Sequence, residues 1–336
     1  MPPDITQLLK TLKREKADYI PIVELGIHPK IKERFLGRPL NNIKDEIEFW
    51  HKAGYDYIKL QPVFKLNLGQ TIVDSDSTIK WASEKQGLIK SFEDLERFYF
   101  PSASEIDYTN FEKVKGLLPE GMGVIGQYGD IFTMTWELMG FEHFAFSLFD
   151  NPELVKALND RIGNLVLSMF DFISGQDSVN IIWYSDDIAY KTGLMVSPSI
   201  LDIYFFPWLE KIGNLTKKYS KPFIYHSDGV LYQVMDKLID CGIDALHPIE
   251  PKAMQIADVK RKYGEKLSLI GNIDVDLLCR GKGNDIRNQV LLNIKQAGFN
   301  GGYCVGSGNS IPDYVHYENY ITMIETVKEF NRKNQN

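Results

Sequence analysis

The stretch "PFIYHSDGVLYQVMDKLIDCGIDALHPIE" (residues 222–250) holds two short β-rich runs with a helical pattern between them. The runs 222–228 and 244–250 combine aromatic and branched residues. Residues 231–242 repeat apolar side chains at the spacing of an amphipathic helix and end on Gly242. A strand, a helix and a second strand in this order predict two parallel strands in one sheet.

The same alternation extends along the whole chain. We predict eight strands, at 19–25, 55–61, 121–127, 179–187, 222–228, 244–250, 267–274 and 301–307. Helical patterns separate them, and Asn151-Pro152 and Ser197-Pro198 mark the starts of two long ones, at 151–173 and 198–219. No linker or repeat divides the chain. We therefore predict an α/β fold, a single (β/α)8 TIM barrel over residues 1–336 with extra helices, in which a long insertion at 64–118 decorates the barrel or covers it as a lid.

Composition narrows the possible functions. The 336 residues are 44% hydrophobic and 25% charged, which is typical of a globular protein. The net charge of -7 and the scattered lysines and arginines provide no basic surface for nucleic acid. The longest apolar stretches fall well short of the ~20 residues that cross a membrane. Three widely spaced cysteines indicate no disulfide framework, so we expect a reducing, cytoplasmic location.

Polar residues gather where the predicted strands end, which is where such barrels place their active sites. These residues are Glu24, Gln61, Gln127, Asp186, Asp187, His226, Asp228, Glu250, Asn272, Asp274, Ser307 and Asn309. The set holds carboxylates, amides and one imidazole, and it has no lysine and no Gly-rich phosphate loop. Schiff-base and nucleotide chemistry are therefore disfavoured.

His226 and Asp228 are the strongest candidates in this set. Side chains two residues apart on a strand share a face, with Cα atoms ~7 Å apart, so both could bind one Zn²⁺ ion. A metal-free acid/base pair is a second interpretation. In a third, Asp228 caps a helix that begins near Val230 and His226 bonds across the barrel. Asp186 and Asp187 face opposite ways, so one of them at most points inward, and either could instead cap the following turn.

Five motifs together resemble the uroporphyrinogen decarboxylase superfamily over nearly the whole chain. They are "SDDIAYKTGLMVSP" (185–198), "YHSDG" (225–229), "GIDALHPIEP" (242–251), "LIGNID" (269–274) and "GGYCVGSGNSIPDYVHYENY" (301–320). The superfamily has the barrel fold predicted above. It comprises porphyrinogen decarboxylases and corrinoid-linked methyltransferases.

The first predicted strand separates these two branches. Decarboxylases of the superfamily carry an arginine-rich element after that strand, where guanidinium groups hold the carboxylates of the substrate. This chain has "ELGIHPKI" at 24–31 instead, and Glu24 would repel a polyanionic porphyrinogen. The resemblance therefore favours the methyltransferase branch.

Methyltransferases of the superfamily bind zinc through an H-x-C element and a distant second cysteine. His226 matches the histidine, Asp228 stands in place of the first cysteine, and Asn309 in place of the second. Cys304, five residues earlier, is a substitute candidate, so the expected metal ligands are His226, Asp228 and Cys304. A carboxylate makes the site harder than two thiolates and suits chemistry at oxygen.

The resemblance thus implies a methyltransferase that moves a methyl group from a small methoxylated substrate to a corrinoid protein. His226 and Asp228, with Glu250 and Asp187, would assist the leaving oxygen through a metal or as acids. The expected substrate contacts are Glu24, Gln61, Gln127, Asp186, Asn272 and Asn309.

Two rival functions stay open. A lyase that decarboxylates a carboxylated substrate would need Arg14, Arg34 or Arg38 at the active site. A non-catalytic ligand-binding barrel would need none of the residues above for chemistry. Dimers are common in the superfamily, so a homodimer is a further expectation.

Overall fold

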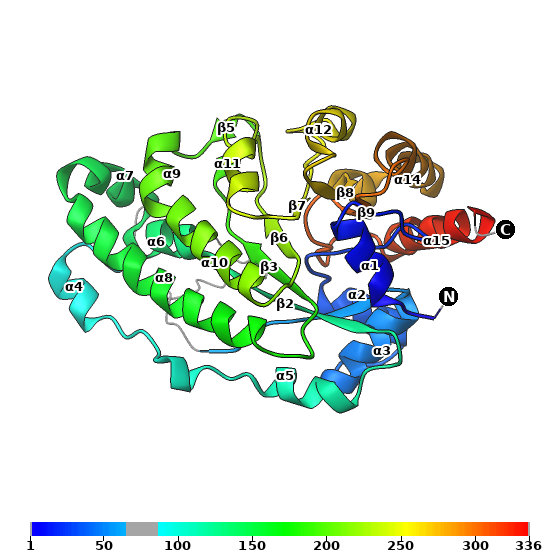
Figure 1. Ribbon diagram of the computed structural model, residues 1–336, viewed down its shortest axis with the longest axis horizontal. Helices are drawn as coiled ribbons and strands as arrows, with labels where there is room; N and C mark the ends of the chain where they lie inside the picture. Colours follow the sequence, from blue (N-terminus) through cyan, green and yellow to red (C-terminus); the bar gives the residue numbers. More distant parts are fainter. Residues whose placement is uncertain (1, 65–86, 335–336) are drawn as a thin grey trace.

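A computed structural model describes residues 2–64 and 87–334. Within them, seven parallel strands form one sheet in the order β1-β2-β3-β6-β7-β8-β9 (Figure 1). The strands are β1 (Tyr57–Leu60), β2 (Gly123–Gly129), β3 (Ile181–Ser185), β6 (Phe223–His226), β7 (Ala245–His247), β8 (Ser268–Ile273) and β9 (Tyr303–Ser307). A small antiparallel pair, β4 (Ala189–Tyr190) and β5 (Gly193–Leu194), follows β3. The α/β class and seven of the eight predicted strands are therefore confirmed.

The remaining predicted strand, at 19–25, is reduced to a single parallel bridge between Ile22 and Val305 of β9. Val23 N donates to Val305 O at 2.8 Å, and Val305 N donates to Pro21 O at 3.0 Å. Pro21 has no N–H of its own, so it limits the hydrogen-bond ladder on this segment. On the other side, Glu24 N donates to the Tyr57 hydroxyl at 2.8 Å. The segment thus meets β1 through a side chain, and the expectation of eight full strands was one too many.

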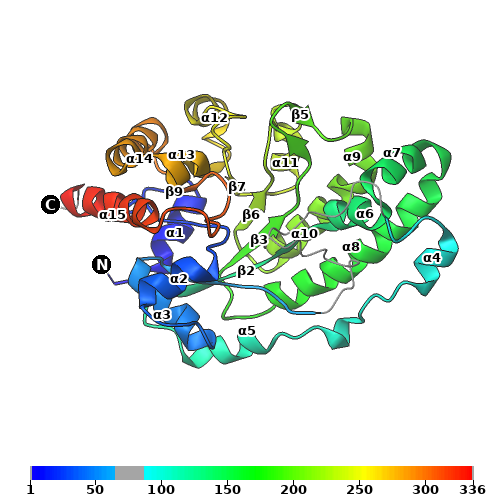
Figure 2. The same cartoon turned by 180° about the vertical axis from the view of Figure 1, so that it is seen from behind.

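Helices cover the outer face of the sheet. The longer ones are α1 (Ile5–Leu12), α2 (Pro29–Leu36), α3 (Ile43–Ala53), α6 (Ile131–Met139), α7 (Phe141–Asp150), α8 (Pro152–Ser174), α10 (Phe206–Lys218), α12 (Ile256–Tyr263), α14 (Gly283–Ala297) and α15 (Tyr317–Asn334). The shorter ones are α4 (Phe92–Arg97), α5 (Thr109–Lys113), α9 (Pro198–Tyr204), α11 (Met235–Asp240) and α13 (Val275–Arg280). Helix α8 packs on β2 and α10, and α14 packs on β8, β9 and α15. Figure 2 shows the same layers from behind, with both chain ends on one side. Among the described residues, no helix has the length and apolar composition needed to cross a bilayer.

Local chemistry explains where several helices begin and break. Helix α8 begins as predicted, with Asn151 accepting from Leu154 N and Pro152 in the first turn. The predicted helix at 198–219 is two helices, because Pro207 in the first turn of α10 has no N–H to donate to the carbonyl of Ile203, four residues earlier. The predicted helix at 231–242 is shorter, since α11 begins only at Met235.

The predicted insertion at 64–118 lies partly outside the described residues, at 65–86. Its described part begins beside α6, where Leu88 N and Ile89 N donate to Leu138 O, and from α4 to α5 it runs along the outer side of α8 (Figures 1 and 2). Tyr108 stacks on Phe172 of α8 with ring centroids 3.8 Å apart, and Arg161 of α8 donates to Leu95 O at 3.2 Å. The described part of the insertion therefore packs on α8.

Candidate functional site

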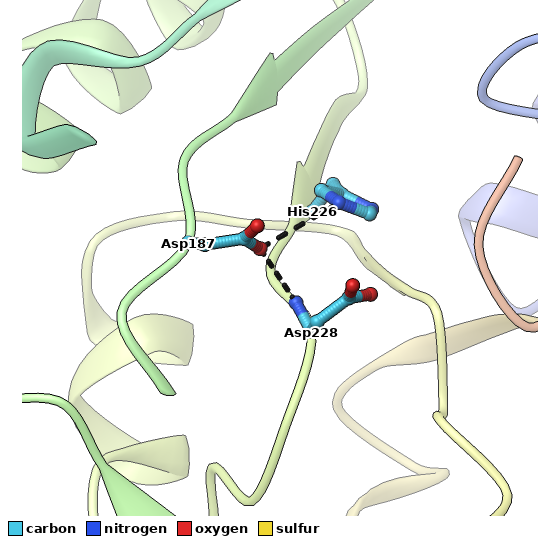
Figure 3. A group of neighbouring side chains, drawn as sticks. All are labelled: Asp187, His226 and Asp228. Carbon is cyan, nitrogen blue, oxygen red and sulfur yellow. Dashed lines mark hydrogen bonds and ion pairs between the residues drawn. The ribbon is translucent and has the colours of Figure 1, made fainter. Parts of the chain in front are cut away.

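The candidate site lies at the carboxyl ends of β3, β6 and β7, which are neighbours in the sheet. Ser185 pairs with His226, and His226 pairs with His247. The residues that follow each strand therefore meet at one edge, although they are far apart in sequence. Figure 3 shows Asp187, His226 and Asp228 converging there.

Asp187, His226 and Asp228 each offer one ligand atom, and these atoms all lie within 4.8 Å of one another. His226 Nε2 is 3.7 Å from Asp187 Oδ1, and the Asp228 main-chain N–H donates to Asp187 Oδ1 at 2.8 Å. His226 is buried, and burial lowers its pKa more than the Asp187 charge raises it. The imidazole is therefore neutral at pH 7, which is the form that binds a metal.

Asp228 is held by the last βα loop. Asn309 Nδ2 donates to Asp228 Oδ2 at 2.5 Å, whereas the buried Asp228 Oδ1 has no hydrogen-bond partner among the described residues. Burial, and then the charges of Asp187 and Glu250, raise the pKa of Asp228 to about 8. Burying a carboxyl oxygen without a hydrogen-bond partner costs free energy. A proton on Asp228 or a cation bound to Oδ1 would offset this cost.

The backbone that carries Asp228 is fixed by Gly229. Its φ of +88° is left-handed, and a Cβ would lie 2.6 Å from Tyr190 O. The Gly229 N–H donates to Glu250 Oε2 at 3.0 Å, while Lys191 Nζ lies 3.3 Å from Glu250 Oε1. Glu250 is thus bound to the same turn as Asp228. No helix begins near Val230, so Asp228 does not cap one, and that interpretation is wrong.

The adjacent Asp186 and Asp187 have different surroundings. Asp186 is 1% exposed and accepts from Phe132 N at 2.7 Å, Thr133 N at 2.9 Å and the Tyr184 hydroxyl at 2.5 Å. Burial raises its pKa to about 6. Asp186 therefore caps the first turn of α6, and Asp187 faces the candidate site.

The other expected substrate contacts lie at separate places along the sheet. Glu24 is fully buried and accepts from Ser307 N at 2.8 Å and Ser307 Oγ at 2.6 Å, and burial raises its pKa to about 8. Gln127 Nε2 donates to Ser185 Oγ at 3.0 Å, and Gln61 donates to Gln127. Asn272 accepts from Asn293 of α14 at 2.7 Å. Asn309 differs from these residues because its side chain bonds to Asp228, one of the candidate metal ligands.

Cys304 does not join the three candidate ligands. It lies within β9, pairs with Ile270 of β8 and is fully buried, and burial raises the pKa of its thiol. A buried, protonated thiol three residues before the strand end is a core residue and a poor ligand. The third candidate metal ligand is Asp187 instead.

A cavity of about 710 Å³ opens beside this group. Two lysines line it, Lys191 and Lys252, and among the described residues that line it there is no arginine. Lys252 Nζ is 3.3 Å from Asp274 Oδ2 and 3.6 Å from Asp276 Oδ2. Six carboxylates line the cavity: Glu137, Asp187, Asp228, Glu250, Asp274 and Asp276. Both lysines are therefore paired within an acidic cavity.

Two polar residues of the sheet are not among the predicted site residues: His247, which is buried at the end of β7, and Lys59 of β1, which is partly buried. His247 Nδ1 lies 2.8 Å from His226 Nδ1. Lys59 Nζ donates to Gln127 Oε1 at 3.0 Å, and burial lowers its pKa to about 7. The available signal was the presence of a histidine and a lysine inside apolar β-runs.

A family model described as Uroporphyrinogen decarboxylase (URO-D) matches residues 85–330. A Pseudoalteromonas translucida (strain TAC 125) protein named uroporphyrinogen decarboxylase is 34% identical over 232 residues, which are 66% of this chain and 62% of that protein. The chain thus matches less than two thirds of that relative's length.

The fold also resembles that of a solved structure, a methyltransferase from Methanosarcina mazei. The TM-score is 0.70 at 16% identity, covering 97% of this chain and 98% of the other. At that identity the likeness concerns the fold.

Proposed function

The chain belongs to the uroporphyrinogen decarboxylase family, and from that premise we propose that it is a methyltransferase of the corrinoid-linked branch. It takes a methyl group from a small methoxylated substrate bound in the acidic cavity and passes it to a partner corrinoid protein. The observation that carries the proposal is the convergence of Asp187, His226 and Asp228 beside that cavity.

These three residues suit a zinc ion. In a tetrahedral site with bonds of about 2.1 Å, ligand atoms lie about 3.4 Å apart, so the three atoms, which lie within 4.8 Å of one another, would move closer on binding the ion. Asp228 Oδ1, which has no hydrogen-bond partner among the described residues, and the neutral His226 are suitable zinc ligands. Asn309 orients Asp228 through its hydrogen bond to Oδ2. Three protein ligands leave a fourth position for substrate. When bound, zinc would act as a Lewis acid toward the substrate oxygen.

The proposed reaction forms one bond to the methyl carbon, breaks one bond and takes up one proton. The methyl carbon gains a bond from the reduced cobalt of the corrinoid, and the carbon–oxygen bond breaks with its electron pair on oxygen. That oxygen then takes up a proton. Without a metal, Asp228 holds a proton at neutral pH because its pKa is raised to about 8, and it is the donor. The position of Asp228, where related methyltransferases carry a cysteine, favours oxygen over sulfur as the leaving atom.

The proposal is tested anaerobically with reduced corrinoid protein and a panel of methoxylated compounds, by following the absorbance of the methylated corrinoid. Asp228→Ala and His226→Ala should slow methyl transfer by about 10²-fold or more. Asp202→Ala, on a half-exposed carboxylate paired with Lys237, is the matched control and should keep the wild-type rate. If the panel yields no methylated corrinoid, the proposal fails.

A decarboxylase is the second candidate, because the Pseudoalteromonas translucida relative carries that name. The acidic cavity argues against it, since two paired lysines provide little positive charge for a polycarboxylate. Release of carbon dioxide from a carboxylated substrate without any corrinoid protein would favour this candidate over methyl transfer.

A further inference from the structure

Two histidine rings lie against each other beneath the candidate site. His226 of β6 and His247 of β7 are 5% and 0% exposed, and their ring centroids are 5.0 Å apart at an interplanar angle of 30°. Their Nδ1 atoms are 2.8 Å apart, which is a hydrogen-bond distance. One Nδ1 therefore carries a proton and the other accepts it.

The surroundings of His226 decide which ring donates. If Nδ1 of His226 were bare, its Nε2 would carry the proton and point toward Asp187. A charge-assisted N–H···O bond closes to about 2.8 Å, whereas Nε2 stands 3.7 Å from Asp187 Oδ1. The shorter and better-formed contact is on the Nδ1 side. His226 therefore donates through Nδ1 and leaves Nε2 as a lone pair facing Asp187 and Asp228.

The surroundings of His247 are consistent with this direction. If its Nδ1 accepts, its Nε2 carries the proton, and within residues 2–64 and 87–334 that atom has no hydrogen-bond partner. The Trp183 ring lies edge-to-face with His247, with centroids 5.0 Å apart at 68°. Such a contact can satisfy a ring N–H through the aromatic face. Trp183 and His247, which are both fully buried, thus pack behind His226.

We propose that His247 is a positioning residue that keeps the proton of His226 on Nδ1, so that Nε2 is presented as a ligand. This rests on the metal-binding role of His226 in the proposed function. His247 replaces the carboxylate or carbonyl oxygen that usually accepts from a metal-bound histidine. It touches neither substrate nor metal and acts through His226.

Nuclear magnetic resonance tests the tautomer directly in metal-free protein. The chain has six histidines, so ¹⁵N-histidine labelling gives few signals, and His226→Gln identifies the ring in question by loss of its signal. Long-range ¹⁵N–¹H correlations should show His226 protonated at Nδ1 and bare at Nε2. A ring bare at Nδ1 overturns the inference.

Zinc affinity, measured by competition with a chelator, tests the consequence. Asn at 247 places a carbonyl oxygen near the former Nδ1, so His247→Asn should stay within about 3-fold of wild type. His247→Leu removes the acceptor and should weaken binding about 10- to 100-fold. His51→Leu, on an exposed ring of α3, is the control. Equal weakening by Asn and Leu at position 247 would show a packing role only and overturn the inference.

These measurements use no methyl donor. If the tautomer and the zinc affinities behave as expected while the methoxylated panel yields no methylated corrinoid, the proposed function fails and the role of His247 stands. If the reverse holds, the role of His247 fails alone.

Discussion

At the scale of single residues, the candidate metal site depends on which side chains converge at the strand ends and which stay enclosed within a strand. Asp228 is part-buried beside two other carboxylates, whereas Cys304 is enclosed within a strand. We expect Cys304→Ala to retain bound zinc at the wild-type stoichiometry and His226→Ala to lose it, as measured by elemental analysis after dialysis. Loss of zinc from Cys304→Ala would return that thiol to the ligand set.

Glu24 offers a test of pH dependence away from the candidate ligands. Burial raises its pKa from 4.5 to about 8, so the folded state binds a proton that the unfolded state releases between these values. Stability should therefore fall as pH rises from about 4.5 to 8, and the penalty is complete above 8. Glu24→Gln removes this titration, and its melting temperature should fall less than that of the wild type between pH 5 and 8.5. Parallel melting curves against pH would contradict the assignment.

At the scale of secondary-structure elements, the neighbouring Asp186 and Asp187 have different roles. Asp186 caps the first turn of α6, and Asp187 lies with the candidate metal ligands. Asp186→Ala should destabilise the protein by about 2–4 kcal/mol, because it leaves two α6 N–H groups and the Tyr184 hydroxyl without their acceptor. Asp187→Ala, at a side chain that is 46% exposed, should cost less than about 1 kcal/mol. Urea unfolding measures both values.

In the methyl-transfer assay, the variant with the larger effect should be Asp187→Ala. The Asp187→Ala protein is expected to be folded but slow. Equal stability of the two variants would mean that the cap on α6 contributes little. Equal activity would mean that Asp187 is not part of the site.

At the scale of the whole molecule, the cavity collects acidic side chains from strand ends and loops that are distant in sequence. Its field should disfavour an anionic substrate. A methoxybenzoate should show a KM about fivefold above that of the matching methoxybenzyl alcohol, which corresponds to about 1 kcal/mol of repulsion. The gap should narrow at high salt, because screening weakens the repulsion. A lower KM for the benzoate would indicate a binding mode that avoids the acidic wall.

Sequence alone determined the succession of strands and helices, because apolar periodicity and caps such as Asn151-Pro152 act locally. It also determined that polar side chains follow the strands, and it singled out His226 and Asp228. The reduced first strand at Pro21 and the break at Pro207 were visible as prolines, but their effect depended on the neighbouring strand and helix.

Only the tertiary structure decided which of these residues meet. The choice of Asp187 over Asp186 depended on α6, whose first turn takes Asp186 as its cap, and the exclusion of Cys304 depended on its burial in β9. His247 entered the site because β7 lies beside β6, a pairing between residues 21 positions apart. Local sequence sets backbone preferences within a few residues, whereas burial, hydrogen-bond partners and raised pKa values arise from neighbours that only the folded chain brings together.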